Sequence, residues 1–150
     1  MSTDVSGMIE CRPGARIWGE DDEDAIWHEA IDLFVLNTGN AYDALACLFG
    51  VRNSFGFRPP AEERGLPEDV SDRVRQRFHA GGWGEHNWGT TWVSWAELTA
   101  LDWDETNLSG SLSRRAVAGE GTHWAPVWDV MRTLAGLHGP EHVRLVVWFY

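Results

Sequence analysis

The sequence predicts an α+β fold in which an antiparallel or mixed sheet is covered by two or three helices. Strand-like segments stand near both ends of the chain, over Val5 to Trp18 and His142 to Tyr150. Helical patterns lie between them, and the two kinds do not alternate as they do in a Rossmann or barrel fold. A chain of 150 residues has the usual length of one domain, so we expect a single domain over residues 1–150.

The first third of the chain is predicted to hold strands and then a buried helix. Val5 to Trp18 is mostly apolar around a Pro-Gly turn, which is typical of two short strands. Residues 25–37 fit either a helix or an extended segment. Ala41 to Phe49 is expected to form a largely buried helix, with Asn40 capping its start and Gly50 in the left-handed conformation at its end.

The middle of the chain is predicted to contain a long loop followed by a helix. Prolines recur from Pro59 to Pro67, and no regular element longer than a turn fits there. Ser71 to His79 then places Val74 and Phe78 four positions apart on one helical face. Ser71 is the expected N-cap of this helix.

The last third of the chain alternates strand and helix signals. A strand is expected over Thr90 to Val93, and a capping box opens a helix over Ser94 to Leu101. Residues 104–121 are rich in Ser, Gly and Asn and are expected to form a surface excursion. Thr122 to His138 has apolar residues at helical spacing with Thr122 as its cap, and His142 to Tyr150 predicts a well-covered strand.

The charge balance restricts the partners that this chain can have. There are 23 acidic side chains against 12 basic ones, all of them arginine, and the formal net charge is −11. Such a chain repels phosphate backbones, so we expect no nucleic-acid partner. Protein surfaces, basic ones above all, and neutral or cationic small ligands remain, and the sequence leaves the oligomeric state open.

Cysteine usage and hydropathy point to a cytoplasmic protein. Cys11 and Cys47 are too few for a disulfide framework and have no metal-ligand spacing. The first residues lack a signal-peptide pattern, and no apolar run approaches the length of a membrane span. We therefore expect neither a membrane association, nor a metal, nor a cofactor.

Tryptophan is the most unusual component of the sequence, with ten residues. Indole rings combine a large apolar area with an N–H donor and are favoured where a surface is partly dry and partly wet. Trp83 and Trp88 lie on a glycine-rich loop and are the first candidates for ligand or partner contact. Trp92 and Trp95 fit either a core or a binding role, whereas Trp124, Trp128 and Trp148 are expected in the core.

Other candidates are weighed against structural roles. Glu85 and His86 could act as acid and base if the protein is an enzyme. Trp103 stands between two aspartates, an arrangement found in sugar or cation sites but more often at a solvated helix end. Arg52 and Asn53 follow a buried helix and could face a ligand, although an arginine there more often satisfies free carbonyls.

Four blocks in order along the chain resemble one family of small uncharacterised proteins found in bacteria and their phages. The blocks are YDALACLFGVRN from Tyr42, RGLPEDVS from Arg64, WVSWAEL from Trp92 and VRLVVWF from Val143. The family has no assigned activity, so the resemblance implies a bacterial or phage context and no reaction. Its members carry Asp and His ahead of the tryptophan that matches Trp92, where this chain has His86, Trp88 and Thr90.

Three hypotheses about function follow from these observations. The first is a non-catalytic binding protein that engages a protein or small ligand through the tryptophans between Trp83 and Trp103. The second is a small enzyme that acts on a neutral or cationic metabolite in an aromatic pocket. The third is an acidic inhibitor or immunity-like protein that blocks a basic site with the run Glu20 to Asp24.

Overall fold

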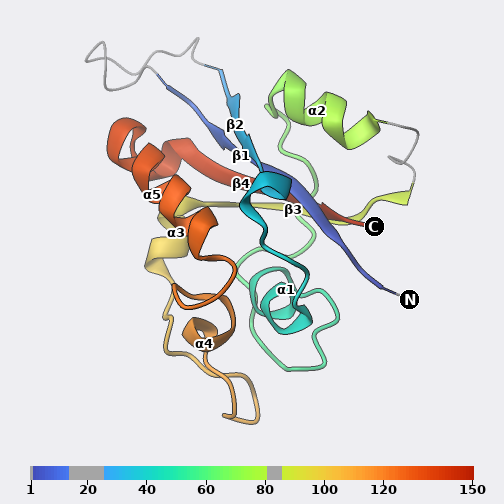
Figure 1. The fold of residues 1–150 in the computed structure, drawn as a ribbon, viewed down its shortest axis with the longest axis vertical. Coiled ribbons are helices and arrows are strands. Elements are labelled where there is room, and N and C mark those ends of the chain that lie inside the picture. Colours follow the sequence, from blue (N-terminus) through green and yellow to red (C-terminus); the bar gives the residue numbers. More distant parts are fainter. Residues whose placement is uncertain (1, 14–25, 81–85) are drawn as a thin grey trace.

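The computed structural model describes residues 2–13, 26–80 and 86–150, and these contain a four-stranded antiparallel sheet in the order β2-β1-β4-β3 (Figure 1). The predicted α+β fold is confirmed. The strands are β1 (Val5–Cys11), β2 (His28–Asp32), β3 (Trp88–Ser94) and β4 (Val143–Phe149).

The last strand, β4, lies inside the sheet and is buried along its whole length. Its register places Val143 opposite Cys11 and Phe149 opposite Val5 of β1, while β3 pairs with its other edge. The dense β-branched and aromatic sequence of this strand explains the position, because both faces meet apolar layers. The prediction of a well-covered C-terminal strand is therefore confirmed.

Helices cover the sheet on both faces (Figure 1). On one face, Leu145 and Val147 of β4 join the main core with α1 (Tyr42–Phe49), α3 (Trp95–Ala100), α4 (Arg114–Ala118) and α5 (Ala125–His138). On the other face, Val146 and Trp148 pack with Val74 of α2. This second helix spans Asp72–His79. The alternation along β4 therefore divides its side chains between two apolar layers.

Local capping signals set several helix ends as predicted. The Ser71 hydroxyl accepts a hydrogen bond from the Val74 amide at the start of α2. Ser94 and Glu97 form a complete capping box at the start of α3. Gly50 ends α1 with φ 75°, in the left-handed region that glycine adopts without strain.

Two predictions about helix starts are wrong in detail. Asn40 does not cap α1, because its Nδ2 donates to the Thr3 carbonyl and to Asp4 instead. The N-cap of α5 is Trp124, and the Thr122 hydroxyl accepts from the Trp124 amide two residues further along the chain. In both cases the side chain of the expected cap has a hydrogen-bond partner outside the first turn of the helix.

Other segments differ from the prediction or resolve its alternatives. Residues 28–32 are extended as β2 and continue into a 3₁₀ helix, η1 (Leu33–Leu36), so both alternatives were partly right. The excursion over 104–121 contains α4, whose Val117 and Ala118 are buried. A short η3 (Pro140–His142) precedes β4. The second strand expected before Trp18 lies outside the described residues.

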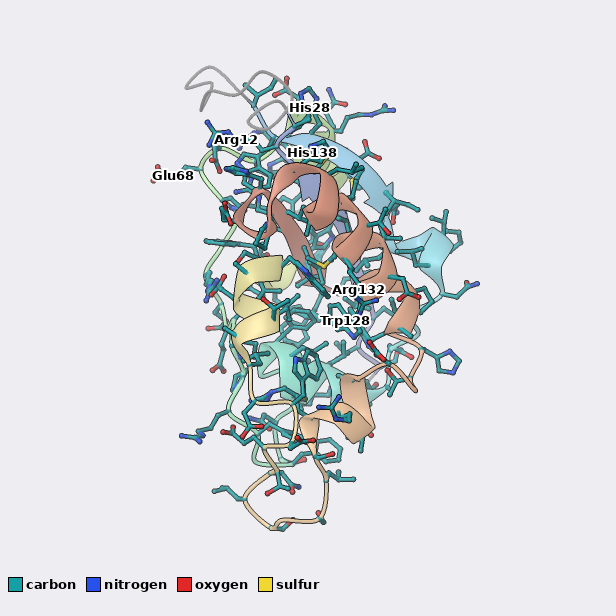
Figure 2. All side chains as sticks on the ribbon, turned by 90° about the vertical axis from the view of Figure 1, so that its left-hand side faces the viewer. Arg12, His28, Glu68, Trp128, Arg132 and His138 are labelled. Carbon is teal, nitrogen blue, oxygen red and sulfur yellow. The ribbon has the colours of Figure 1, made fainter. Side chains whose placement is uncertain are left out.

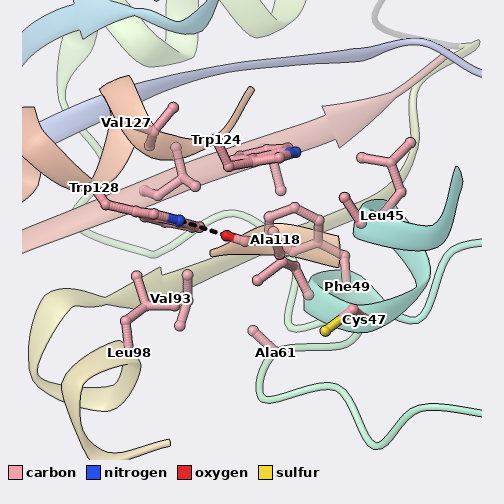
Figure 3. Close-up of a cluster of buried hydrophobic side chains, with 14 of the residues drawn as sticks. Leu45, Cys47, Phe49, Ala61, Val93, Leu98, Ala118, Trp124, Val127 and Trp128 are labelled. Atoms are coloured by element: carbon pink, nitrogen blue, oxygen red, sulfur yellow. Dashed lines mark hydrogen bonds between the residues drawn. The ribbon is translucent and has the colours of Figure 1, made fainter. Parts of the chain in front are cut away.

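Aromatic side chains fill the centre of the main core (Figure 3). Trp128 stacks on Trp124 with ring centroids 5.6 Å apart, and Phe49 lies 5.9 Å beyond Trp124. The Trp128 indole donates its Nε1–H to the carbonyl of Ala118 at 2.6 Å. Trp124, Trp128 and Trp148 are all buried, which confirms the core role predicted for them.

Candidate ligand-binding site

The glycine-rich loop favoured by the sequence is only partly described. Trp83 and Glu85 lie outside the described residues, and His86 is exposed just before β3. Trp88 is the first residue of β3 and not part of the loop, because the strand begins earlier than predicted. The residue is 43% exposed, and its ring centroid lies 5.5 Å from that of Phe149.

Trp92 lies on the α2 face of the sheet, where arginines cover it. The Arg64 guanidinium lies 4.8 Å from its ring centroid, and that of Arg144 lies 6.0 Å away. Arg64 is held in place by the Glu97 carboxylate at 2.6 and 2.9 Å and by the Trp92 carbonyl at 3.1 Å. The ring face of Trp92 is therefore used by the protein's own side chains.

Arg52 and Asn53 hold the loop after α1. Arg52 Nε donates to the Thr3 hydroxyl at 2.9 Å, and its guanidinium lies 4.8 Å from the Tyr42 ring. The Asn53 amide donates to the Phe57 carbonyl at 2.7 Å, while its oxygen accepts from the Phe57 amide at 2.9 Å. These contacts show how both side chains shape the backbone; a ligand contact for them stays a prediction.

The geometry draws attention instead to a hollow of about 240 Å³ between α3, α4 and α5. Rings of Trp95, Trp103 and Trp128 line it, with Arg115 and Arg132 at its edge. Trp128 and Arg132 lie one turn apart on α5, next to each other in the space between the helices (Figure 2). We call this site the Trp hollow.

The walls of the Trp hollow are fixed by local structure. The capping box places Trp95 at the first position of α3. The Trp103 indole donates to the Leu98 carbonyl at the end of that helix, at 3.0 Å. The Trp128 ring lies 6.4 Å from Trp95 and 6.0 Å from Trp103. Because the indole N–H groups of Trp103 and Trp128 are satisfied by backbone carbonyls, the hollow presents mainly ring surface.

Charged groups surround the mouth of the Trp hollow. Arg115 pairs with Asp104 at 3.1 Å, and Arg132 pairs with Glu120 and Asp129 at 2.9 Å each. Arg132 also lies 5.7 Å from the Trp95 ring centroid. The arginine side chains are 59% and 51% exposed, so each pair contributes only about 0–1 kcal/mol to stability.

A second polar cluster lies on the opposite face of the sheet, around Arg144. Its Nε donates to Glu10 at 2.7 Å and its Nη1 to Asp69 at 2.9 Å. The Trp27 ring lies 3.8 Å from the guanidinium carbon, and its Nε1 donates to Asp69 at 3.0 Å. Burial alone would raise the pKa of Asp69, but the hydrogen bonds and charge of Arg144 with the Trp27 bond hold that pKa below its ordinary value.

This Arg144 cluster joins four parts of the chain that are distant in sequence. It connects β4, β1, the residue before β2 and the loop before α2. Glu10 also accepts from the Ser71 amide at 2.8 Å, at the cap of α2. The cluster therefore fastens α2 and its loop to the sheet, which is a structural role.

Other kinds of site find no support in the described part of the chain. Residues 2–13, 26–80 and 86–150 contain no group of His, Cys, Asp or Glu side chains arranged to hold a metal ion. Within the same ranges, no helix has the length and apolar character to cross a membrane. No protein-family model, curated protein or solved structure matches the chain.

Sequence reasoning found some residues of the Trp hollow and missed others. Trp103 was a candidate and Trp95 an open case, and both line the hollow. Trp128 was assigned to the core, and it is buried there while one part of it faces the hollow. Arg115 and Arg132 were not considered. A usable signal was the spacing of Trp128 and Arg132, four positions apart on one helix.

Proposed function

We propose that this chain is a non-catalytic binding protein of a bacterium or phage that holds the planar ring of a small ligand in the Trp hollow. The observation that carries the proposal is a preformed hollow walled by Trp95, Trp103 and Trp128, with polar groups only at its edge. Ligand sites are commonly concave, apolar and ringed by a few polar groups. The bacterial or phage context rests on the resemblance of the sequence blocks described above.

The volume of the hollow favours a small ligand over a protein partner. At about 240 Å³ it is below the roughly 300–1,000 Å³ of pockets for drug-sized ligands, so it has space for one ring system. The edge formed by Thr99, Arg115, Glu120 and Arg132 is polar. Large exposed apolar side chains such as Phe34 and Leu108 do not line the hollow.

A binding role fits the hollow better than catalysis does. Proton transfer needs a positioned acid or base near the reacting group. Among the described residues that line the hollow, Glu120 is the one carboxylate, and it is exposed and engaged by Arg132. The alternative roles for Glu85, His86 and the acidic run Glu20 to Asp24 stay predictions.

A blocking substitution with a matched control tests the proposal. Thr99 on α3 is exposed, lines the hollow and donates its hydroxyl to the Ala96 carbonyl at 3.0 Å. Thr133 on α5 is also exposed and donates to the Asp129 carbonyl at 2.9 Å, but it does not line the hollow. Thr99→Phe should fill the mouth of the hollow, whereas Thr133→Phe places the same ring on the surface elsewhere.

The readout is the indole N–H resonances of the tryptophans during titration with the neutral probe 1-naphthylacetamide. A favourable binding free energy of about 0.3 kcal/mol per non-hydrogen atom gives a ligand of this size a dissociation constant of about 1 mM. We expect saturable shifts for Trp95, Trp103 and Trp128 in the unmodified chain and in Thr133→Phe, and none in Thr99→Phe. Equal shifts in Thr99→Phe and Thr133→Phe would sink the proposal, and so would the absence of saturable shifts in the unmodified chain with both this probe and its carboxylate analogue 1-naphthylacetate.

A further inference from the structure

The guanidinium groups at the Trp hollow point to the chemical class of its ligand. Residues lining the hollow carry two positive charges, on Arg115 and Arg132, against the single negative charge of Glu120. The chain as a whole has a formal net charge of −11. Within the lining, basic side chains therefore outnumber the acidic one, while Asp104 and Asp129 pair with the same arginines from outside the hollow.

Arg115 and Arg132 pair with exposed carboxylates, unlike Arg144. Their present carboxylates, Asp104, Glu120 and Asp129, are between 70% and 80% exposed and already well solvated. Arg144, in contrast, is buried against the equally buried Glu10. A ligand that offers an acceptor at the mouth of the hollow replaces a solvated surface pair and leaves no buried group unpaired.

The position of Arg132 determines where the charged group of a ligand would lie relative to its bound ring. Its guanidinium lies 5.7 Å from the Trp95 ring centroid, beside the ring surface that lines the hollow. A carboxylate joined to a bound ring by a short link would meet this group. Arginine suits that task because its planar fork of donors matches the two oxygens of a carboxylate.

The same charges disfavour a cationic ligand. A set of tryptophan rings resembles the aromatic cages that hold quaternary ammonium groups. Here the guanidinium of Arg132 already occupies the cation position near Trp95, and Arg115 adds a second positive charge. A cation entering the hollow would meet both, so the neutral or cationic ligand expected from the sequence is not the one that this site favours.

We infer that the ligand of the Trp hollow is a small planar aromatic acid, with its ring between the tryptophans and its carboxylate on Arg132 and Arg115. This inference rests on the proposed function and narrows it. The ring supplies apolar contact, and the carboxylate replaces Glu120 and Asp104 on the arginines. Long-range repulsion by the acidic chain is screened beyond about 8 Å at physiological ionic strength, so the exchange of carboxylates on the two arginines dominates.

Three probes that share a naphthalene ring test the inference: 1-naphthylacetate, the neutral 1-naphthylacetamide and the cation 1-naphthylmethylammonium. We expect the acetate to bind at least tenfold more tightly than the amide, and the cation more weakly than both. In Arg115→Gln/Arg132→Gln the ratio of the acetate affinity to the amide affinity should fall to about one, whatever the change in the amide affinity itself. Glu120→Gln should raise the affinity for the acetate severalfold, because it removes a carboxylate that competes for Arg132.

Arg73→Gln is the control, because Arg73 is an exposed arginine on α2 paired with Glu29, outside the hollow. It should leave all three affinities unchanged. Equal binding of acetate and amide overturns the inference and leaves the proposed function standing. Tighter binding of the cation overturns it as well. Failure of all three probes to give saturable shifts overturns both proposals.

Discussion

Arg144 lies on the α2 face of the sheet, and its replacement tests how strongly the polar cluster there holds the fold together. In Arg144→Met, the fully buried carboxylate of Glu10 loses its guanidinium partner. The Ser71 amide remains as a hydrogen-bond donor to it. Removing one partner of a buried ion pair costs about 3–5 kcal/mol. That is a large share of the roughly 5–15 kcal/mol by which domains are stable.

Two comparison variants separate this effect from a general loss of contacts. Asp69→Asn weakens the other ion pair of Arg144, but the Asp69 side chain is 66% exposed, so we expect a loss of only about 0–1 kcal/mol. Glu10→Gln/Arg144→Met removes both buried charges together. Because no unpaired charge then remains inside, the double variant should be more stable than Arg144→Met alone.

The assay is urea unfolding followed by far-UV circular dichroism, which reports mainly the backbone of the whole chain, whereas tryptophan fluorescence would be affected directly by the change beside Trp27. The free energy of unfolding is extrapolated to water at unchanged m-value. If the unfolding free energy of Arg144→Met lies within about 1 kcal/mol of that of the unmodified chain, the ion pair contributes no more than an exposed one. A double variant that is less stable than Arg144→Met would refute the charge argument itself.

Three further outcomes are expected. A side chain on Gly7 in β1 would collide with a carbonyl of β4, so Gly7→Ala should lower the unfolding free energy by about 1–3 kcal/mol. A side chain on Gly136 in α5 would meet open space, so Gly136→Ala should raise the unfolding free energy by up to about 1 kcal/mol. Burial raises the pKa of Cys47 to about 12, so this thiol should react with Ellman's reagent near neutral pH only after unfolding. Hydrogen bonds, first from Arg64, hold the pKa of Glu97 below its ordinary value of 4.5. The ionised carboxylate therefore stabilises the fold above that pH, and this contribution is lost as the pH falls through the lowered pKa. Arg64→Gln should make the unfolding free energy fall less steeply between about pH 6 and about pH 3.

Elements that depend on neighbouring residues were predictable from the sequence. The hydroxyl of Ser94 and the carboxylate of Glu97 satisfy amides within one turn, and Ser71 does the same at α2. The β-branched run over Val143–Phe149 can be buried only inside a sheet. Asn40 shows the limit, because its amide prefers the carbonyl of Thr3, which only the tertiary fold brings near.

The candidate binding site was less predictable because packing assembles it. Trp95, Trp103 and Trp128 come from three separate segments, and nothing local shows that their rings converge. The helix that carries Arg115 was itself missed: α4 is only five residues long and stands in a Ser- and Gly-rich segment. Its cap, Ser113, was a readable signal.

The double role of Trp128 explains how a small protein keeps such a hollow open. Its ring is stacked on Trp124 inside the core and fixed by the Ala118 carbonyl, yet it also lines the hollow. A ligand of the kind proposed would therefore meet walls that folding has already ordered, and little conformational entropy would be lost on binding. The ring geometry is shared with the core and is costly to alter, whereas the arginines at the edge are exposed and only weakly paired. Selectivity among aromatic ligands should thus reside in Arg115 and Arg132, where substitutions change charge without disturbing the fold.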